Sequence, residues 1–226
     1  MCTNYHATPR DRLPSIVSAM RTPELEWPRS IYRDFDAPII IRGESEPELI
    51  IASYSMVPKR HLPPHDKNRS TMNARAETIG QKQSFAKSWK AAQLCLVPLI
   101  DFIEWSYEKG DDIAERYAIG MADDSPFAVA GLWRSWDEHD GTTAHSFTQI
   151  TVNAEHHPLM KRFHKKNDEK RSLVIIPESE YDDWLQCTDP DKARVYLQLY
   201  PAELMKARPA PKQPKEKRVE STDGLF

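Results

Sequence analysis

The chain lacks the features that typically place a protein outside the cell or in a membrane. It contains three cysteines, an odd number without paired spacing, which argues against a disulfide framework. No Cys-x-x-Cys pair or close cysteine–histidine cluster indicates zinc, so we expect neither a metal nor a cofactor. The first residues, MCTNYHATPRDR, contain no apolar signal region, and no run approaches the roughly 20 apolar residues that span a bilayer. We therefore expect a cytoplasmic protein without a membrane partner, whose cysteines remain free thiols.

The sequence also lacks an excess of positive charge. Its 31 Lys and Arg residues face 34 Asp and Glu residues, so the net charge is −3. A nucleic-acid site would therefore have to be a local basic patch. Apolar residues make up only 39% of the chain, but a length of 226 residues still suits one domain with a sizeable core.

Short β-rich segments dominate what is present. They predict strands at residues 37–42, 48–54, 93–107 with a break at Pro98, 116–121, 127–136, 146–153 and 171–176. Helices are expected at residues 81–92, 180–186 and 189–199, the last with an Asp-Pro start that suits a helix N-terminus. Many strands with irregular connections predict one β-rich α+β domain over residues 1–205, a distorted barrel with a few flanking helices.

From residue 206 the composition changes to the proline- and lysine-rich segment KARPAPKQPKEKRVESTDGLF. Such a composition cannot bury a core, so we expect residues 206–226 to form a disordered basic tail. This tail is either a solvated terminus or a weak, salt-sensitive attachment to an acidic partner such as nucleic acid.

Cys2 is the most informative residue because it directly follows Met1. Removal of Met1 would leave one residue with an α-amine and a thiol on adjacent carbons. These groups titrate near ~8 and ~8.5, so both are partly nucleophilic at neutral pH. A 1,2-aminothiol condenses with an aldehyde to an imine and then to a thiazolidine ring, and it can also attack amides as an N-terminal nucleophile. The alternative is that position 2 holds a small residue that only permits methionine removal.

A second candidate is the segment NARAET at residues 73–78, which follows a proline- and charge-rich loop. If this segment is extended, Asn73 and Arg75 point the same way. Asn73 supplies a neutral donor and acceptor, and Arg75 supplies a fork that suits phosphate. The structural alternative is that both side chains brace a loop.

Two further segments add a carboxylate and a histidine. Glu104 ends the apolar run LCLVPLIDFIEW, so we expect it to be partly buried, as suits a group that transfers protons. His164 ends the segment HHPLMKRFH, whose first residues, His156 and His157, we expect at the surface. Each residue alone also fits an ordinary structural or exposed role. Together with Cys2 and Arg75, they form a set suited to acting on a carbonyl in a phosphorylated or polynucleotide substrate.

Five motifs in this order resemble the SRAP (SOS response-associated peptidase) family. They are Met1-Cys2, NARAET at 73–78, FIEW at 102–105, FAVAGLW at 127–133 and the segment 151–164. The resemblance extends from Cys2 to about residue 184. Members of this family recognise abasic sites in single-stranded DNA and cross-link to them. The resemblance therefore implies the SRAP fold, a DNA partner with abasic sites, and a role in the DNA damage or SOS response.

The resemblance also implies a role for each candidate residue. Cys2, freed of Met1, attacks the ring-opened sugar aldehyde: its amine forms a Schiff base and its thiol closes the thiazolidine. Asn73 positions the Cys2 amine and the sugar. Glu104 and His164 transfer protons during ring opening and imine chemistry. Arg75 binds a DNA phosphate.

Three segments depart from the family pattern. Thr3 and Asn4 stand where the family has Gly-Arg, which removes the phosphate contact of that arginine. The chain has YSMVP at residues 54–58 where the family has Trp-Gly-Leu-x-Pro, so Tyr54 or a neighbour is expected to stack on a base. The loop around His164 also differs, and it supplies the expected basic patch of Lys161, Arg162, Lys165 and Lys166.

Three functions remain open from the sequence. The first is a covalent shield for abasic sites in single-stranded DNA, acting as a monomer. The second is a cysteine-type peptidase that at least removes its own Met1, although no second site for a substrate chain is evident. The third is a non-covalent single-strand binder that does not depend on Cys2. Whether the protein is an enzyme, for example with lyase-like Schiff-base chemistry, therefore also stays open.

Overall fold

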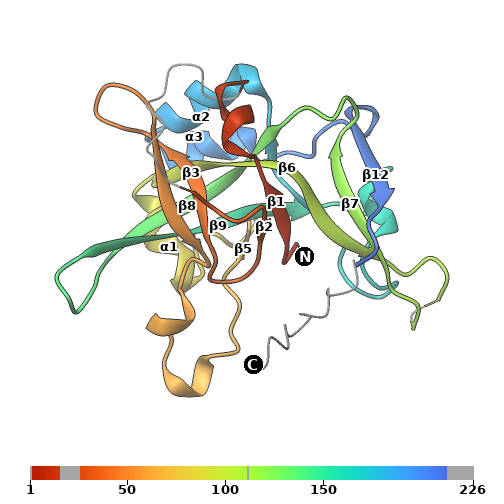
Figure 1. Cartoon of the computed structure of the whole chain (residues 1–226), viewed down its shortest axis with the longest axis horizontal. Coiled ribbons are helices and arrows are strands. Elements are labelled where there is room, and N and C mark those ends of the chain that lie inside the picture. Colours follow the sequence, from red (N-terminus) through yellow and green to blue (C-terminus); the bar gives the residue numbers. More distant parts are fainter. Residues whose placement is uncertain (1, 16–25, 111, 213–226) are drawn as a thin grey trace, which may run out of the picture.

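The chain folds into a sheet of short and long strands with a few small helices (Figure 1). The computed structural model describes residues 2–15, 26–110 and 112–212. The strands are β1 (Tyr5–Ala7), β2 (Ser30–Ile31), β3 (Asp36–Ile41), β4 (Glu48–Tyr54), β5 (Asn73–Arg75), β6 (Leu94–Ser106), β7 (Glu115–Met121), β8 (Phe127–Asp137), β9 (Thr143–Asn153), β10 (Arg171–Leu173), β11 (Ile175–Ile176) and β12 (Met205–Pro209). The α-helices are α1 (Gln83–Lys90), α2 (Tyr181–Gln186) and α3 (Pro190–Ala193). None of the helices in these described ranges is long and apolar enough to cross a membrane.

Five of the strands close into a ring. They pair in the order β8, β9, β4, β3 and β6, and β6 returns to β8 because it pairs with β3 along one edge and with β8 along the other. The long strand β6 then runs on to pair with β1 and β7 (Figure 1). This arrangement confirms the predicted β-rich α+β fold with a distorted barrel.

Alternate residues of the strands belong to two different hydrophobic clusters. On β6, Cys95 lies in one cluster and Leu96 in the other, as the alternation of side chains along a strand requires. The cluster of Leu96 also contains side chains of α1, α2 and α3, so it lies where helices cover the outside of the ring. The cluster of Cys95 therefore fills the inside, and it includes Cys2.

The predicted break of β6 at Pro98 is wrong, because the strand runs through the proline. Pro98 pairs with Ala128 of β8, and its carbonyl accepts from Thr8 N on the opposite edge. The proline nitrogen points to that same edge. Along this edge, Leu96 is the last residue paired with β3 and Leu99 is the first paired with β1, so Pro98 lies in the gap between the two partners. No ladder hydrogen bond is required there, so the missing N–H costs little.

Other boundaries differ from expectation by small amounts. The expected strand 171–176 is two strands, because the nitrogen of Val174 bonds to Ile150 of β9 while its carbonyl bonds to Ala130 of β8. The expected helix 189–199 is α3 followed by a 3-10 turn, and the side chain of Asp189 accepts from Asp191 N, as expected for its N-cap. Strands β1, β2 and β5 were not expected, since each has only two or three residues.

The prediction that disorder begins at residue 206 is wrong for the first residues of that segment. Strand β12 pairs with β7, with Met205 opposite Met121 and Pro209 opposite Tyr117. Arg208 Nη2 on β12 also lies 2.6 Å from Oδ2 of Asp101, a buried carboxylate on β6. Backbone pairing and this ion pair hold the segment in place in spite of its polar composition. The rest of the expected tail, residues 213–226, lies outside the described residues.

Candidate functional site

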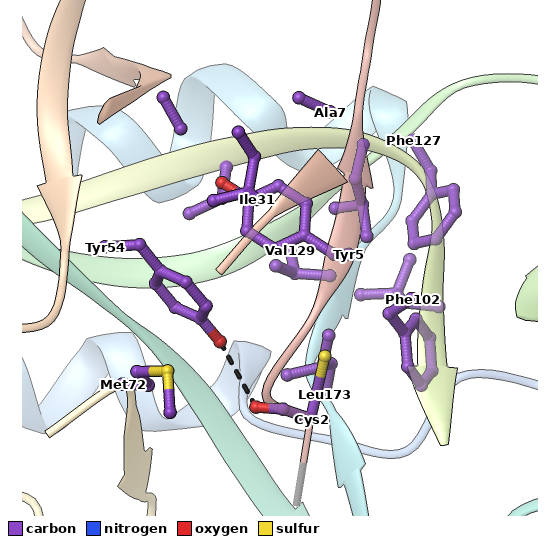
Figure 2. Packing of buried hydrophobic residues seen from close by; sticks show 14 of the residues in the cluster. Cys2, Tyr5, Ala7, Ile31, Tyr54, Met72, Phe102, Phe127, Val129 and Leu173 are labelled. Atoms are coloured by element: carbon purple, nitrogen blue, oxygen red, sulfur yellow. Dashed lines mark hydrogen bonds between the residues drawn. The ribbon is translucent and has the colours of Figure 1, made fainter. Parts of the chain in front are cut away.

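Cys2 is buried just ahead of β1, at the end of the cluster that fills the ring (Figure 2). It is only 1% exposed, and Tyr54, Met72 and Leu173 lie around it in Figure 2. Its carbonyl oxygen accepts hydrogen bonds from Asn73 Nδ2 at 2.6 Å and from Tyr54 Oη at 3.3 Å, and its Sγ donates to Asn4 O at 3.2 Å. These contacts fix the position of the residue expected to carry both nucleophiles.

Asn4 has a structural role that the sequence did not reveal. Its Nδ2 donates to Ile31 O of β2 at 3.0 Å, and its Oδ1 accepts from Arg116 Nη2 of β7 at 2.8 Å. The side chain is buried, so it ties the segment after Cys2 to the strands on either side. Arg116, which was not among the candidate residues, thus brings a guanidinium within two residues of Cys2. Only the fold could identify it, because Asn4 and Arg116 are far apart in the sequence.

The structure corrects the role predicted for Tyr54. Its ring is 0% exposed, so it has no open face on which a base could stack. It instead stacks on Phe147 at 5.2 Å and meets Tyr5 edge-on at 5.3 Å. Its single hydroxyl hydrogen is shared between Gln149 Oε1 at 2.8 Å and the Cys2 carbonyl at 3.3 Å. Tyr54 therefore helps to hold the Cys2 carbonyl and does not present an aromatic surface to a ligand.

Asn73 reaches Cys2 because β5 pairs in parallel with β9, with Asn73 opposite Gln149. Among the described residues, Asn73 Oδ1 and Gln149 Nε2 are buried and have no hydrogen-bond partner. Buried polar atoms are normally paired, so Asn73 Oδ1, on the side chain that holds Cys2, can accept a hydrogen bond from a polar ligand.

Glu104 and His164 come together from different parts of the chain. Glu104 is 4% exposed on β6, and its Oε2 lies 3.1 Å from His164 Nε2. The backbone of His164 has φ +67°, a left-handed conformation that is uncommon outside glycine. This turn is held because His164 N donates to Trp105 O at 2.8 Å and Lys170 Nζ donates to His164 O at 3.1 Å. Strain that the surroundings maintain in this way is typical of functional sites.

The electrostatics connect Cys2 with this pair. Burial, and then the charge of the nearby Glu104, raises the pKa of the Cys2 thiol well above its usual range. The thiol is therefore neutral at pH 7 in the folded protein. A base must take its proton before it can act as a strong nucleophile.

The expected DNA-binding cations line two grooves. Arg75 is exposed, pairs with Glu169 Oε2 at 2.6 Å, and lines a groove of about 340 Å³ that also contains Asn73. A second groove, of about 510 Å³, is lined by Lys161, Arg162 and His164 among others. Both grooves therefore reach a residue next to Cys2 or Glu104.

The remaining candidates are less directly placed. Lys165 is exposed, with its Nζ 5.7 Å from the centre of the Tyr107 ring, and Arg162 is held by Glu108 at 3.1 and 3.2 Å. His156 is exposed as expected, but His157 is buried and not at the surface. The Nε2 atom of His157 contacts Tyr200 O at 2.8 Å, and its Nδ1 accepts from two backbone nitrogens of the following turn, so its role is structural. Within the described ranges, no group of three or more His, Cys, Asp or Glu residues is arranged to hold a metal ion.

Sequence comparison identifies relatives over most of the chain. The profile of the family described as "SOS response associated peptidase (SRAP)" matches residues 1–215. "Abasic site processing protein YoqW" of Bacillus subtilis is 33% identical over 139 residues, which are 60% of this chain and 58% of YoqW. "Abasic site processing protein YobE" of the same organism is 32% identical, over 60% of this chain and 59% of YobE. The matched region thus spans less than two thirds of these relatives.

Solved structures share the fold. A protein from Bordetella bronchiseptica superposes with a TM-score of 0.83 and 28% identity, covering 93% of this chain and 100% of that one. A protein from Bacteroides thetaiotaomicron has a TM-score of 0.76 and covers 93% of this chain and 92% of its own, but at 20% identity it is informative for the fold alone.

Proposed function

Because this chain belongs to the SOS response associated peptidase family, we propose that it captures abasic sites in single-stranded DNA covalently through Cys2. The names of the matched relatives, abasic site processing proteins, support this substrate. The observation that carries the proposal is the position of Cys2: Asn73 binds its carbonyl, and the Glu104 carboxylate, paired with His164, lies close enough to raise the pKa of its thiol.

The first step would join the Cys2 amine to the sugar. An abasic sugar exists mainly as a cyclic hemiacetal, and opening its ring moves a proton from the hydroxyl to the ring oxygen. Glu104 and His164, 3.1 Å apart, form a pair that can give and take this proton. The amine nitrogen freed by loss of Met1 then bonds to the aldehyde carbon, and the carbonyl oxygen leaves as water to give the imine. The same pair supplies the acid that this dehydration requires.

The second step would close the ring. The Cys2 sulfur bonds to the imine carbon, and the thiol proton ends on the former imine nitrogen, so no oxidant or further reagent is needed. Since burial and Glu104 raise the pKa of this thiol, its proton must pass to a nearby base as the sulfur attacks. Glu104, whose charge acts on this thiol, would take that proton. The product is a thiazolidine that holds the DNA on the protein.

Phosphate binding would orient the strand. Arg75 lies in the groove that begins at Asn73, and Lys161 and Arg162 lie in the groove that begins at His164. A strand that follows both grooves would contact Asn73 and His164, which lie next to Cys2 and Glu104, and Lys165 is an exposed cation near the second groove. We propose that these side chains supply the sequence-independent part of binding, and that the protein acts as a cytoplasmic monomer.

The autopeptidase alternative is less well supported. Asn73 and Tyr54 both donate to the carbonyl of Cys2, which belongs to the Cys2–Thr3 peptide bond. Removal of Met1 requires donors at the carbonyl of the preceding peptide bond instead. The observed hydrogen bonds at the Cys2 carbonyl suit the positioning of Cys2, and a separate aminopeptidase is sufficient to remove Met1.

Intact mass spectrometry tests the proposal. The purified protein is weighed before and after incubation with a single-stranded oligonucleotide that carries one abasic site. The expected result is a starting mass without Met1 and an adduct that forms without borohydride, because a thiazolidine needs no reduction to persist. A protein that lacks Met1 but forms no adduct would contradict the proposal. Adduct formation that depends entirely on borohydride would contradict the second step alone.

A further inference from the structure

We propose that Tyr32 and Phe35 form a stacking platform for a nucleobase next to the abasic site. This proposal rests on the proposed function, because it assigns a contact to the same DNA strand. It also replaces the role that Tyr54 cannot perform, since the Tyr54 ring is fully buried.

The two rings are unusual in their exposure. Tyr32 is 46% exposed and Phe35 is 44% exposed, and they are the only aromatic residues among the large exposed hydrophobic side chains in the described ranges. Their centroids lie 5.6 Å apart with an interplanar angle of 70°, so they form an edge-to-face pair. A pair of exposed rings in contact is what a base-stacking site requires, because every base offers a π-face.

The turn that carries the rings is held firmly. Phe35 N donates to Tyr32 O at 3.0 Å, and Asp34 between them adopts φ 64°. Asp34 N donates to Tyr54 O, and Tyr54 N donates to Phe35 O, each at 2.9 Å. A turn fixed by these bonds presents its rings without a large ordering cost on binding.

The same bonds connect the turn of the platform to the segment that carries Cys2. The backbone nitrogen and carbonyl of Tyr54 both bond to the turn, and its hydroxyl donates to the Cys2 carbonyl. Ile31, which precedes Tyr32, accepts from the side chain of Asn4. The platform is thus connected to the segment that carries Cys2 in two ways, through Tyr54 and through the side chain of Asn4.

The platform itself carries both signs of charge, since Arg33 Nε lies 3.5 Å from Asp34 Oδ2, but the neighbouring groove is basic and favours nucleic acid as the occupant. Arg33, between the two rings in sequence, donates to Arg69 O at 2.8 Å and to Lys67 O at 3.1 Å. Arg69 lines the groove of about 340 Å³ that also contains Arg75 and Lys82. Surface carboxylates pair with Arg69 and Arg75, but exposed pairs of this kind are weak and a phosphate can replace them. A single strand could therefore place its phosphates along the basic groove and stack a base on the exposed rings beside it.

Equilibrium binding with a non-reactive DNA tests this platform separately from the chemistry. The probe is a single-stranded oligonucleotide with a tetrahydrofuran abasic analogue, which lacks the aldehyde, and with 2-aminopurine on one side of it or on the other. Wild type is compared with Tyr32→Leu, Phe35→Leu and the double variant, which keep apolar side chains but remove the rings. Leu204→Ala is the matched control, since Leu204 is also exposed, at 47%.

The expected result is about tenfold weaker binding for each lost ring, the usual scale of base–aromatic stacking. Fluorescence quenching of 2-aminopurine on one side should be lost in the double variant and kept in Leu204→Ala. The dependence of affinity on salt should not change, because no phosphate contact is removed. Unchanged affinity and quenching in the double variant would overturn the platform and would leave the surface to some other partner.

The outcome is separable from that of the proposed function. An adduct between wild type and a true abasic oligonucleotide, together with unchanged binding of the tetrahydrofuran probe by the double variant, would retain the function and reject the platform. Lost quenching without any adduct in wild type would support the platform and reject the covalent chemistry.

Discussion

Two buried carboxylates, Asp101 and Glu104, lie three residues apart on β6, each beside a histidine but with different further neighbours. Asp101 is 2% exposed, and its oxygens contact His6 Nδ1 at 2.5 Å and Arg208 Nη2 at 2.6 Å. Glu104 is 4% exposed and faces His164 and the thiol of Cys2. Residues three apart on a strand point to opposite faces, so the same strand places the two groups in separate surroundings.

The difference shows how neighbours decide what a buried carboxylate does. Burial alone raises the pKa of Asp101, but the hydrogen bonds and charges of His6 and Arg208 more than offset burial and lower it. A carboxylate held charged by an arginine joins β1, β6 and β12 and has no proton to exchange near pH 7. Glu104 faces a histidine and a thiol, which can both exchange protons. We therefore assign stability to Asp101 and chemistry to Glu104.

The largest effect is expected from removal of the Cys2 thiol, because the proposed proton transfer to Glu104 then has no donor. Cys2→Ala is expected to abolish the borohydride-independent adduct while leaving much of the non-covalent binding to DNA. Adduct formation is followed by mass, and binding by fluorescence anisotropy with the tetrahydrofuran oligonucleotide. Persistence of a borohydride-independent adduct in Cys2→Ala would contradict the role of the thiol.

Glu104→Gln tests whether Glu104 transfers protons in the reaction. We expect adduct formation to slow by about 100-fold, the usual scale for the loss of an acid–base group. The amide keeps the shape of the side chain, so thermal stability should change little. The rate is measured in single-turnover experiments with excess protein. A wild-type rate would remove Glu104 from the mechanism and would leave His164 as the only proton-transfer group of the pair.

Asp101→Asn tests the structural half and is the matched control for Glu104→Gln. Loss of charge-assisted hydrogen bonds should lower the free energy of unfolding by about 2 kcal/mol at pH 7. Because the pKa of Asp101 is lowered in the fold, this advantage of the wild type exists above the ordinary value of 3.8 and is lost as the pH falls below it. Urea unfolding between pH 7 and pH 2 measures both effects. A slower adduct rate in folded Asp101→Asn would show that the two carboxylates do not have separate roles.

The smallest effect is expected for Arg75, which lines the same groove as Asn73. Arg75→Ala should weaken the binding of single-stranded DNA a few-fold and reduce the slope of log affinity against log salt by about 0.7, the value for one phosphate contact on a single strand. Binding is measured at several salt concentrations, with Lys192→Ala, an exposed cation on α3, as the control. An unchanged slope would mean that Glu169 keeps Arg75 away from the phosphate.

Much of the fold could be predicted from the sequence, because the strands of the ring are β-rich and alternate between two apolar clusters. The prediction failed where a partner strand decided the outcome. Pro98 is tolerated only because β3 ends and β1 begins on either side of it. Strand β12 is polar in composition and is held by its pairing with β7 and by Arg208. Neither partner can be recognised from local composition.

The candidate site was predictable as a set of residues but not as an arrangement. The motifs identified Cys2, Asn73, Glu104 and His164, and the fold brings Asn73 to Cys2 and His164 to Glu104. The sequence could not tell that Tyr54 faces inward, because an aromatic residue at a strand end suits either the core or the surface. It also could not locate Tyr32 and Phe35, whose importance depends on an exposure that only the turn after β2 creates.

The burial of Cys2 has a consequence for the order of events during translation. The donors that hold its carbonyl, Tyr54 and Asn73, follow it by 52 and 71 residues, and the chain is synthesised from its N-terminus. The ribosome therefore completes the first residues long before the groups that enclose them exist. The proposed function requires the removal of Met1, and during this interval Tyr54 and Asn73 do not yet hold Cys2. The proposed function therefore implies that the aminothiol is formed before the fold encloses Cys2.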